Sequence, residues 1–206
     1  MKLFKILALS TALISMFCVG CGGNDKKAAA PAPAKAQATE APKVTNDKAL
    51  VVYFSQSGNT QKVANMIQKQ TGAAMFRVET VKTYASNYHA LIDEAKKEQQ
   101  ANARPELKKA KVDNLKQYDT VFVGYPNWWG TLPMPLFTFF EANDMTGKNI
   151  VPFVTHEGSA FGTSLNDLAK LAPKANIKEG IDIRGGRVGD SEADVTAWLK
   201  KGGYVK

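Results

Sequence analysis

Residues 51–60 read Val-Val-Tyr-Phe-Ser-Gln-Ser-Gly-Asn-Thr, and this stretch decides the fold. Its first four residues are β-branched or aromatic, which is typical of a strand covered on both faces of a sheet. Beyond the polar residues, Val63, Met66 and Ile67 follow the spacing i, i+3 and i+4 of an apolar helix face. The stretch therefore predicts a buried strand, a short polar loop and an amphipathic helix in direct succession.

The polar loop has the composition of an anion site. Small or hydroxylated side chains dominate it: Ser55, Ser57, Gly58, Asn59 and Thr60. Free backbone N–H groups and the positive end of the helix dipole would meet there, which suits a phosphate. The loop contains no lysine or arginine, which argues against a nucleotide-hydrolysing P-loop. An ordinary turn whose hydroxyl groups only cap the helix is the alternative reading of the loop alone.

The full run from residue 51 to residue 67 resembles the signature of the flavodoxin family. The matching positions are Val51, Val52, Tyr53, Ser55, Gly58, Thr60, Ala64 and Ile67. This resemblance implies that the loop binds the phosphate of FMN, with the contacts supplied by Ser55, Gln56, Ser57, Gly58, Asn59 and Thr60.

Strands and helices continue to alternate along the chain. Further strands are predicted at residues 73–78, 120–124, 149–155 and 180–184. Helices are predicted at residues 87–102 and 134–141, near residues 165–169, and after a capping box formed by Ser191 and Asp194. This alternation favours an α/β fold with a parallel sheet covered on both faces. The resemblance covers residues 48–204 and implies a flavodoxin-like doubly wound five-stranded parallel sheet in the order 2-1-3-4-5.

Two adjacent tryptophans, Trp128 and Trp129, follow the third predicted strand within a loop rich in proline and glycine. The two side chains cannot both point into a core from such a loop. An indole exposed at the end of a strand would stack well on a flat aromatic ring. Packing of both tryptophans beneath the loop is the alternative reading.

The resemblance assigns two further loops to the flavin. One edge of the isoalloxazine ring would be wrapped by Pro126, Asn127, Trp128, Trp129 and Gly130. The other edge would be wrapped by His156, Glu157, Gly158, Ser159, Phe161 and Gly162. His156 could donate a hydrogen bond to the ring or to a substrate carbonyl, or it could point to solvent.

Other charged and apolar groups indicate no further cofactor. The predicted helix at residues 87–102 carries Leu91, Ile92 and Ala95 on one face and solvated charges on the other, with His89 among the solvated residues. His89 and His156 have no carboxylate at a recognised ligand spacing, so no metal site is expected. Nucleic-acid binding is not indicated either. The formal net charge is +8 for the whole chain but only +4 for residues 47–206, and the basic residues of that part are scattered.

The N-terminal residues have the composition of an export signal and a tether. Residues 1–20 combine a basic start with a short apolar run, and the small residues around Cys21 resemble a bacterial lipoprotein signal. Residues 21–47 are rich in alanine, proline and lysine and are expected to form a flexible tether to the domain at residues 48–206. The resemblance to a lipoprotein signal implies lipidation at Cys21 and attachment to a membrane in the bacterial cell envelope. A plain secretory signal is the alternative.

Three classes of function remain open at this point. The folded domain has no cysteine, because Cys18 and Cys21 both lie at the signal junction, so redox work requires a bound cofactor. The first class is an FMN electron carrier that serves a redox partner protein. The second is an NAD(P)H-dependent reductase of quinones or other small electron acceptors, and the third is an FMN-binding module without redox turnover. The absence of a GxGxxG run favours the carrier.

Overall fold

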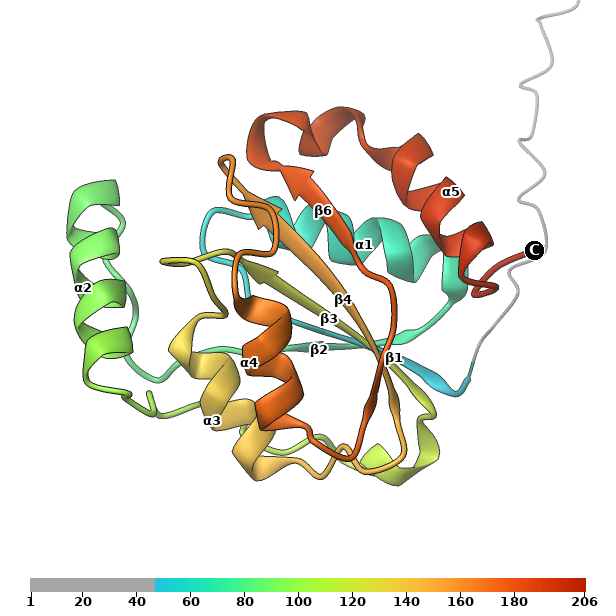
Figure 1. Cartoon of the computed structure of the whole chain (residues 1–206), viewed down its shortest axis with the longest axis horizontal. Coiled ribbons are helices and arrows are strands. Elements are labelled where there is room, and N and C mark those ends of the chain that lie inside the picture. The colour runs from blue at the N-terminus through green and yellow to red at the C-terminus, as the bar shows by residue number, and fades with distance from the viewer. Residues whose placement is uncertain (1–46) are drawn as a thin grey trace, which may run out of the picture. The chain divides into compact units, whose positions relative to one another are not determined.

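The computed structural model of the chain describes residues 47–206 (Figure 1). Its strands are β1 (Ala49–Tyr53), β2 (Ala74–Arg77), β3 (Thr120–Pro126), β4 (Asn149–His156), β5 (Asn176–Ile177) and β6 (Ile181–Arg184). Its α-helices are α1 (Asn59–Thr71), α2 (Tyr88–Gln100), α3 (Met134–Ala142), α4 (Ser164–Leu171) and α5 (Glu192–Lys201). Two short 3-10 helices are η1 (Leu115–Gln117) and η2 (Gly185–Asp190). The predicted signal peptide, the lipidation site and the predicted tether up to residue 46 lie outside the described residues.

The sheet is parallel at every strand pair and runs in the order β2-β1-β3-β4, with β5 and β6 both beside β4. This confirms the predicted order 2-1-3-4-5. The first strand is an interior strand of the sheet, because Val51 lies beside Met75 of β2 on one side and Phe122 of β3 on the other. Among residues 47–206, no helix is both long enough and apolar enough to cross a membrane.

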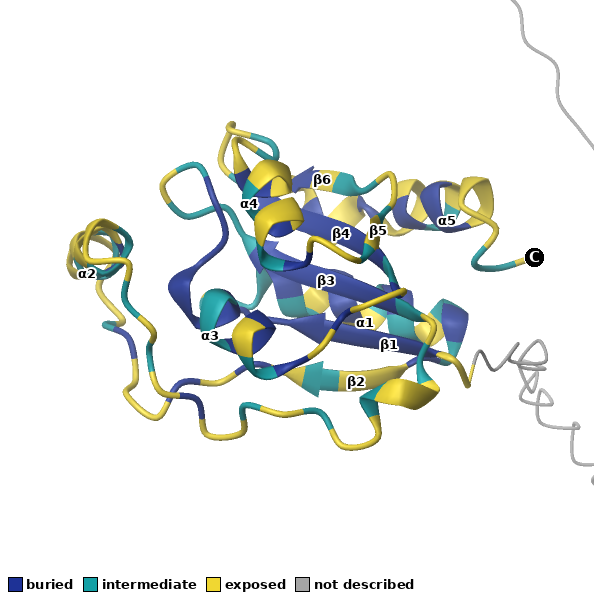
Figure 2. Cartoon of the chain, turned by 60° about the horizontal axis from the view of Figure 1, so that its bottom comes forward, coloured by how far each residue is buried: buried dark blue, intermediate teal, exposed yellow. Residues whose placement is uncertain are grey.

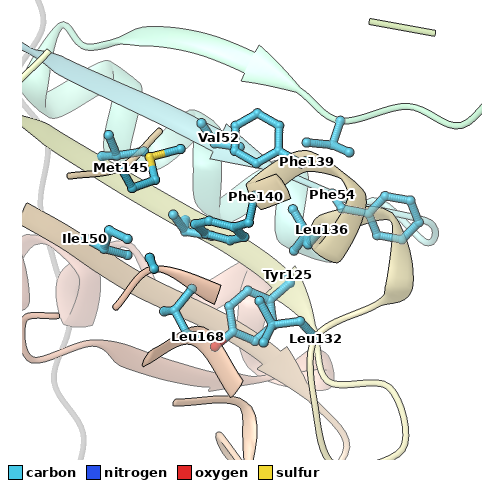
Figure 3. Close-up of a cluster of buried hydrophobic side chains, with 14 of the residues drawn as sticks. Val52, Phe54, Tyr125, Leu132, Leu136, Phe139, Phe140, Met145, Ile150 and Leu168 are labelled. Carbon is cyan, nitrogen blue, oxygen red and sulfur yellow. The ribbon is translucent and has the colours of Figure 1, made fainter. Parts of the chain in front are cut away.

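Alternating side chains of β1 reach two separate cores, one on each face of the sheet. Leu50 and Val52, together with Phe54 directly after the strand, belong to a core that is completed by α3 and α4. Figure 3 shows part of this first core, including Leu136 and Phe139 of α3. The second core lies under α1 and α5 and takes its β1 side chains from Ala49, Val51 and Tyr53. Burial on both faces explains why β1 is an unbroken apolar run.

The fifth position of the sheet is divided into two short strands. Ile150 of β4 pairs with Ile177 of β5, and Phe153 of β4 pairs with Ile181 of β6. The chain between the two strands therefore has one residue more than the facing part of β4, as in a β-bulge. Pro152 lies in that part of β4 and has no backbone N–H to donate. The predicted strand at residues 180–184 corresponds to β6 alone.

Helix α2 stands apart from the layered body, as Figures 1 and 2 show from two directions. Most of its residues are at least partly exposed, and Ala95 is its one buried residue. Its N-cap is Asn87, whose side chain accepts a hydrogen bond from the backbone N–H of Ala90 at 3.1 Å. The helix expected at residues 87–102 is thus present, but it does not cover the sheet.

The predicted capping box of the last helix is wrong. Ser191 is the N-cap residue of α5, but its side chain makes no capping hydrogen bond. Its hydroxyl instead donates to the carbonyl of Val188 at 2.9 Å. The reason is local: η2 runs directly into α5, so the serine hydroxyl bonds back to the preceding turn.

Candidate functional site

A cavity of about 740 Å³ lies at the carboxyl ends of β1, β3 and β4. Ligands bind in this position in doubly wound sheets, where the connections from adjacent strands leave to opposite faces. The first loop contributes Gln56, Ser57 and Asn59, and the second contributes Pro126, Asn127, Trp128 and Trp129. The third contributes His156, Glu157, Gly158 and Ser159. All three loops expected from the sequence therefore meet at one cavity.

The N-terminus of α1 borders the cavity and forms its polar end. Gly58 precedes the helix with a φ of 91°, a left-handed conformation that favours glycine. The backbone N–H of Gln61 donates to the Ser55 hydroxyl at 3.3 Å, so Ser55 caps the helix from a buried position. The N–H groups of Asn59 and Thr60 belong to the first helical turn, which lacks intrahelical acceptors. With no acidic residue in that turn, this end attracts anions.

Hydrogen bonds to neighbouring strands hold the first loop in place. The hydroxyls of Thr60 and Thr155 share a buried hydrogen bond of 2.8 Å, which joins the start of α1 to β4. Arg77 of β2 donates to the carbonyl of Ser55 at 3.3 Å and places a cation behind the loop. Ser55, Gly58 and Thr60 are not among the residues that line the cavity. Their part is to fix the conformation of the loop.

Trp128 forms a wall of the cavity and is rigidly supported from behind. Its ring packs edge-on against Phe54 at 5.3 Å and against Tyr84 at 5.2 Å, measured between ring centroids. The Tyr84 hydroxyl donates to Glu98 of α2 at 2.6 Å. The pKa of Tyr84 is raised well above its ordinary value, mainly by burial and secondly by this hydrogen bond, so the hydroxyl remains a donor.

Trp129 has a different role from its neighbour. Its side chain is 46% exposed, and its backbone adopts a positive φ of 52°. The indole N–H donates to the carbonyl of Ile92 at 2.8 Å, and the Lys96 ammonium lies 4.4 Å from the ring centroid. Trp129 therefore fastens α2 to the second loop in addition to lining the cavity.

Helix α2 supplies a wall of the cavity that the sequence pattern did not predict. Its contributions are Tyr88, Leu91, Ile92 and Ala95, and Thr155 and Gly185 complete the lining. The apolar face of the helix was visible in the sequence. Nothing in that pattern showed that the face borders a cavity and not the sheet.

The second and third loops are tied together through Asn127. Its side-chain oxygen accepts from the backbone N–H of Gly130 at 2.9 Å, and its side-chain nitrogen donates to the carbonyl of Ala160 at 2.8 Å. Gly162 fits closely against the carbonyl of Gly130, where an added Cβ would lie 2.4 Å from the oxygen. Phe161 packs over Gly180. Gly130, Phe161 and Gly162 therefore shape the loops without lining the cavity.

Asp167 of α4 anchors both of these loops from outside the cavity. Its carboxylate accepts from Thr131 at 2.7 Å and from Thr163 at 3.3 Å. Burial acts to raise the pKa of Asp167, but the hydrogen bonds from Thr131 and Lys170 and the nearby ammonium outweigh it, so the pKa is lowered. The ionised carboxylate is thus the form that holds the loops.

His156 is engaged by the protein on both ring nitrogens. The backbone N–H of Gly158 donates to Nδ1 at 2.9 Å, so Nδ1 carries no proton and Nε2–H donates to Asp182 at 3.0 Å. In this arrangement the ring orients the third loop and has no free donor for a ligand. His89 lies exposed on α2, outside the cavity. Within residues 47–206, no group of His, Cys, Asp and Glu side chains is placed to hold a metal ion.

These features define a doubly wound α/β protein with a cofactor-sized cavity at its switch point. The sequence profile of the flavodoxin family matches residues 48–202, and the chain therefore belongs to that family.

The chain is also similar to solved structures. A proposed flavoprotein from Bacteroides eggerthii is 33% identical, with a TM-score of 0.66, over 75% of this chain and 97% of that chain. A proposed flavoprotein from Bacteroides uniformis is 27% identical, with a TM-score of 0.67, over 75% and 98%. A flavoprotein from Lactobacillus acidophilus, crystallised in complex with FMN, is 24% identical, with a TM-score of 0.58, over 72% and 97%. A comparison with curated proteins found no match.

The lowered pKa of Asp167 predicts a specific pH dependence of stability. The carboxylate stabilises the folded state above the pKa of the unfolded chain, about 4, and this contribution is lost as the pH falls through the lower folded pKa. We expect Asp167→Asn to lower the free energy of unfolding by about 1 kcal/mol at pH 6. The difference from wild type should vanish in strong acid.

Urea unfolding at a series of pH values measures this difference. Asp93→Asn is the matched control, because Asp93 is exposed on α2 and lies outside the cavity. A difference for Asp167→Asn that stays constant from pH 6 into strong acid would contradict the assignment.

Proposed function

We propose that this protein binds FMN in the cavity and transfers electrons through it. The observation that carries the proposal is the division of the cavity into a polar end and an aromatic end. Ser57 and Asn59 supply polar side chains at the N-terminus of α1, and Trp128 supplies an aromatic wall. FMN has the matching division, with a phosphate at one end and a flat ring at the other. Membership of the flavodoxin family and the FMN complex of the Lactobacillus acidophilus protein support the choice.

The residues present fit the two ends of FMN. Hydroxyl and amide side chains, together with N–H groups of the first helical turn, would hold the phosphate by hydrogen bonds. None of the residues that line the cavity is a lysine or arginine, so hydrogen bonding would dominate over ion pairing. Trp128 would cover the ring, and its contacts with Phe54 and Tyr84 keep that surface in place.

Bound FMN would supply the capacity to accept and release electrons, which no cysteine or metal group in residues 47–206 provides. The protein's own part is to bind, orient and shield. The apolar side chains of α2 exclude water from one side of the cavity, and Asn127 holds the second and third loops at a fixed spacing.

The polar end predicts selectivity for the phosphate. Ser57→Ala and Asn59→Ala should each weaken FMN binding by about tenfold, because a hydrogen bond to a charged oxygen contributes about 1.5–3 kcal/mol. Riboflavin, which lacks the phosphate, should change by less than about twofold. Fluorescence titration with both flavins measures this, and Ser86→Ala, exposed and outside the cavity, is the control. Equal losses for both flavins would show that the loop does not hold the phosphate.

The aromatic end predicts different effects for the two tryptophans. Trp128→Ala should reduce the quenching of flavin fluorescence on binding and weaken FMN and riboflavin alike, because the stacking surface is removed. Trp129→Phe keeps an aromatic ring but removes the hydrogen bond to Ile92, so quenching should change little. If the Trp129 variant lost the quenching and the Trp128 variant kept it, the assignment would be reversed.

We further propose that electrons pass between this protein and a redox partner protein. The sequence carries no dedicated nicotinamide motif, which supports a carrier over a reductase. The FMN-loaded protein should oxidise NAD(P)H slowly by itself and be reduced rapidly only with a partner reductase. Stopped-flow absorbance measures both rates. Sustained unaided turnover of NAD(P)H with a quinone would instead identify a small-acceptor reductase.

We also propose where the protein is located, on the basis of the sequence alone. We infer that Cys21 is lipidated and that the protein is held at a membrane of the bacterial cell envelope. Cys21→Ser should release it from the membrane fraction while leaving its unfolding transition unchanged. Fractionation and mass spectrometry of the mature protein test this. An N-terminus other than an acylated Cys21 would rule out the lipid anchor.

A further inference from the structure

Glu157 places a carboxylate at the polar end of the cavity. It directly follows the last residue of β4 and lines the cavity together with Asn59 and Gly185. A Cβ added to Gly185 would lie 2.3 Å from Oε1 of Glu157 and 2.9 Å from the side-chain nitrogen of Asn59. The carboxylate and the first residue of α1 therefore lie on the same side of Gly185, close to each other.

The negative charge of Glu157 is not neutralised by an ion pair. Within residues 47–206 no lysine, arginine or histidine nitrogen lies within the 4.0 Å of a salt bridge to its carboxylate. The neighbouring His156 is paired with Asp182 instead. Arg77, which approaches the loop from behind, donates to the Ser55 carbonyl and does not line the cavity. The end of the cavity that suits a phosphate is thus also the end that contains an unpaired carboxylate.

We propose that Glu157 is a specificity-determining residue that weakens the binding of phosphate-bearing flavin relative to uncharged riboflavin. This proposal rests on the proposed function, because it assumes that the flavin phosphate lies at the N-terminus of α1. The carboxylate opposes the attraction of the helix dipole and of the hydrogen-bond donors. The site therefore discriminates between FMN and riboflavin less strongly than its donors alone would allow, and FMN exchanges more readily.

The expected size of the effect follows from Coulomb's law. Glu157 is exposed, so its interaction with a phosphate a few ångströms away is reduced by the high dielectric constant of water and by salt. Because the phosphate carries close to two negative charges at neutral pH, the repulsion corresponds to about three- to tenfold in affinity.

Substitutions at Glu157 test the proposal in the full-length protein. Dissociation constants for FMN and riboflavin are measured by fluorescence titration at low and high NaCl concentration. Glu157→Gln removes the charge with little change in shape, and Glu157→Asp keeps the charge. Glu106→Gln is the matched control, because Glu106 is exposed and lies outside the cavity.

We expect Glu157→Gln to bind FMN about three- to tenfold more tightly than wild type, with riboflavin within about twofold. The gain should shrink at high salt, and Glu157→Asp and Glu106→Gln should remain near wild type. The proposal would be overturned if Glu157→Gln left the ratio of FMN to riboflavin affinity unchanged. If both affinities changed in parallel, the ratio would also be unchanged, and the result would indicate a contact of Glu157 with the ribityl chain or the ring. Wild-type protein that bound neither flavin would overturn the proposed function itself, which separates the two failures.

Discussion

The burial of both faces of β1 is the constraint on which the rest of the structure depends. Alternate residues of this strand enter two different cores, so the strand must lie inside the sheet with helices on both sides. The chain leaves β1 into α1 on one face, whereas α3, which follows β3, packs on the other. A crevice at the carboxyl ends of these two strands is a necessary consequence. The cavity is found there, and its polar end is the helix that starts directly after β1.

Hydrogen bonds then convert the crevice into a defined cavity. Thr60 joins the first loop to β4, and Asn127 joins the second loop to the third. Asp167 anchors the second and third loops to α4 through two threonine hydroxyls. These residues lie mostly behind the cavity surface, so their expected effect on a ligand is indirect. Among the residues that do line the cavity, Ser57 and Asn59 supply polar groups at the start of α1, and Trp128 supplies an aromatic wall.

Much of the fold could be predicted from the sequence, because long buried strands leave a clear apolar pattern. The first, third and fourth strands and the three loops after them were located in this way. The break in the fifth strand could not be predicted, because it depends on Pro152 in the facing part of β4 and on one additional residue between β5 and β6. The role of α2 was also missed, since periodicity shows that Leu91 and Ile92 share a face but not what that face borders.

Predictions about individual side chains had mixed outcomes for physical reasons. The expectation that the two tryptophans cannot both point into the core agrees with the structure, where Trp129 is exposed and its indole N–H donates to the carbonyl of Ile92. A free donor on His156 was one option from the sequence, but the backbone of Gly158 and the carboxylate of Asp182 occupy both ring nitrogens. The capping role of Ser191 failed because its hydroxyl bonds to Val188. Such choices depend on neighbours that are distant from any sequence motif.

The most direct test of the account is a crystal structure of the protein with FMN bound. We expect one FMN in the cavity, with its phosphate within hydrogen-bonding distance of Ser57 and Asn59 and its ring against Trp128. A phosphate bound away from the N-terminus of α1, or a flavin bound outside the cavity, would contradict it.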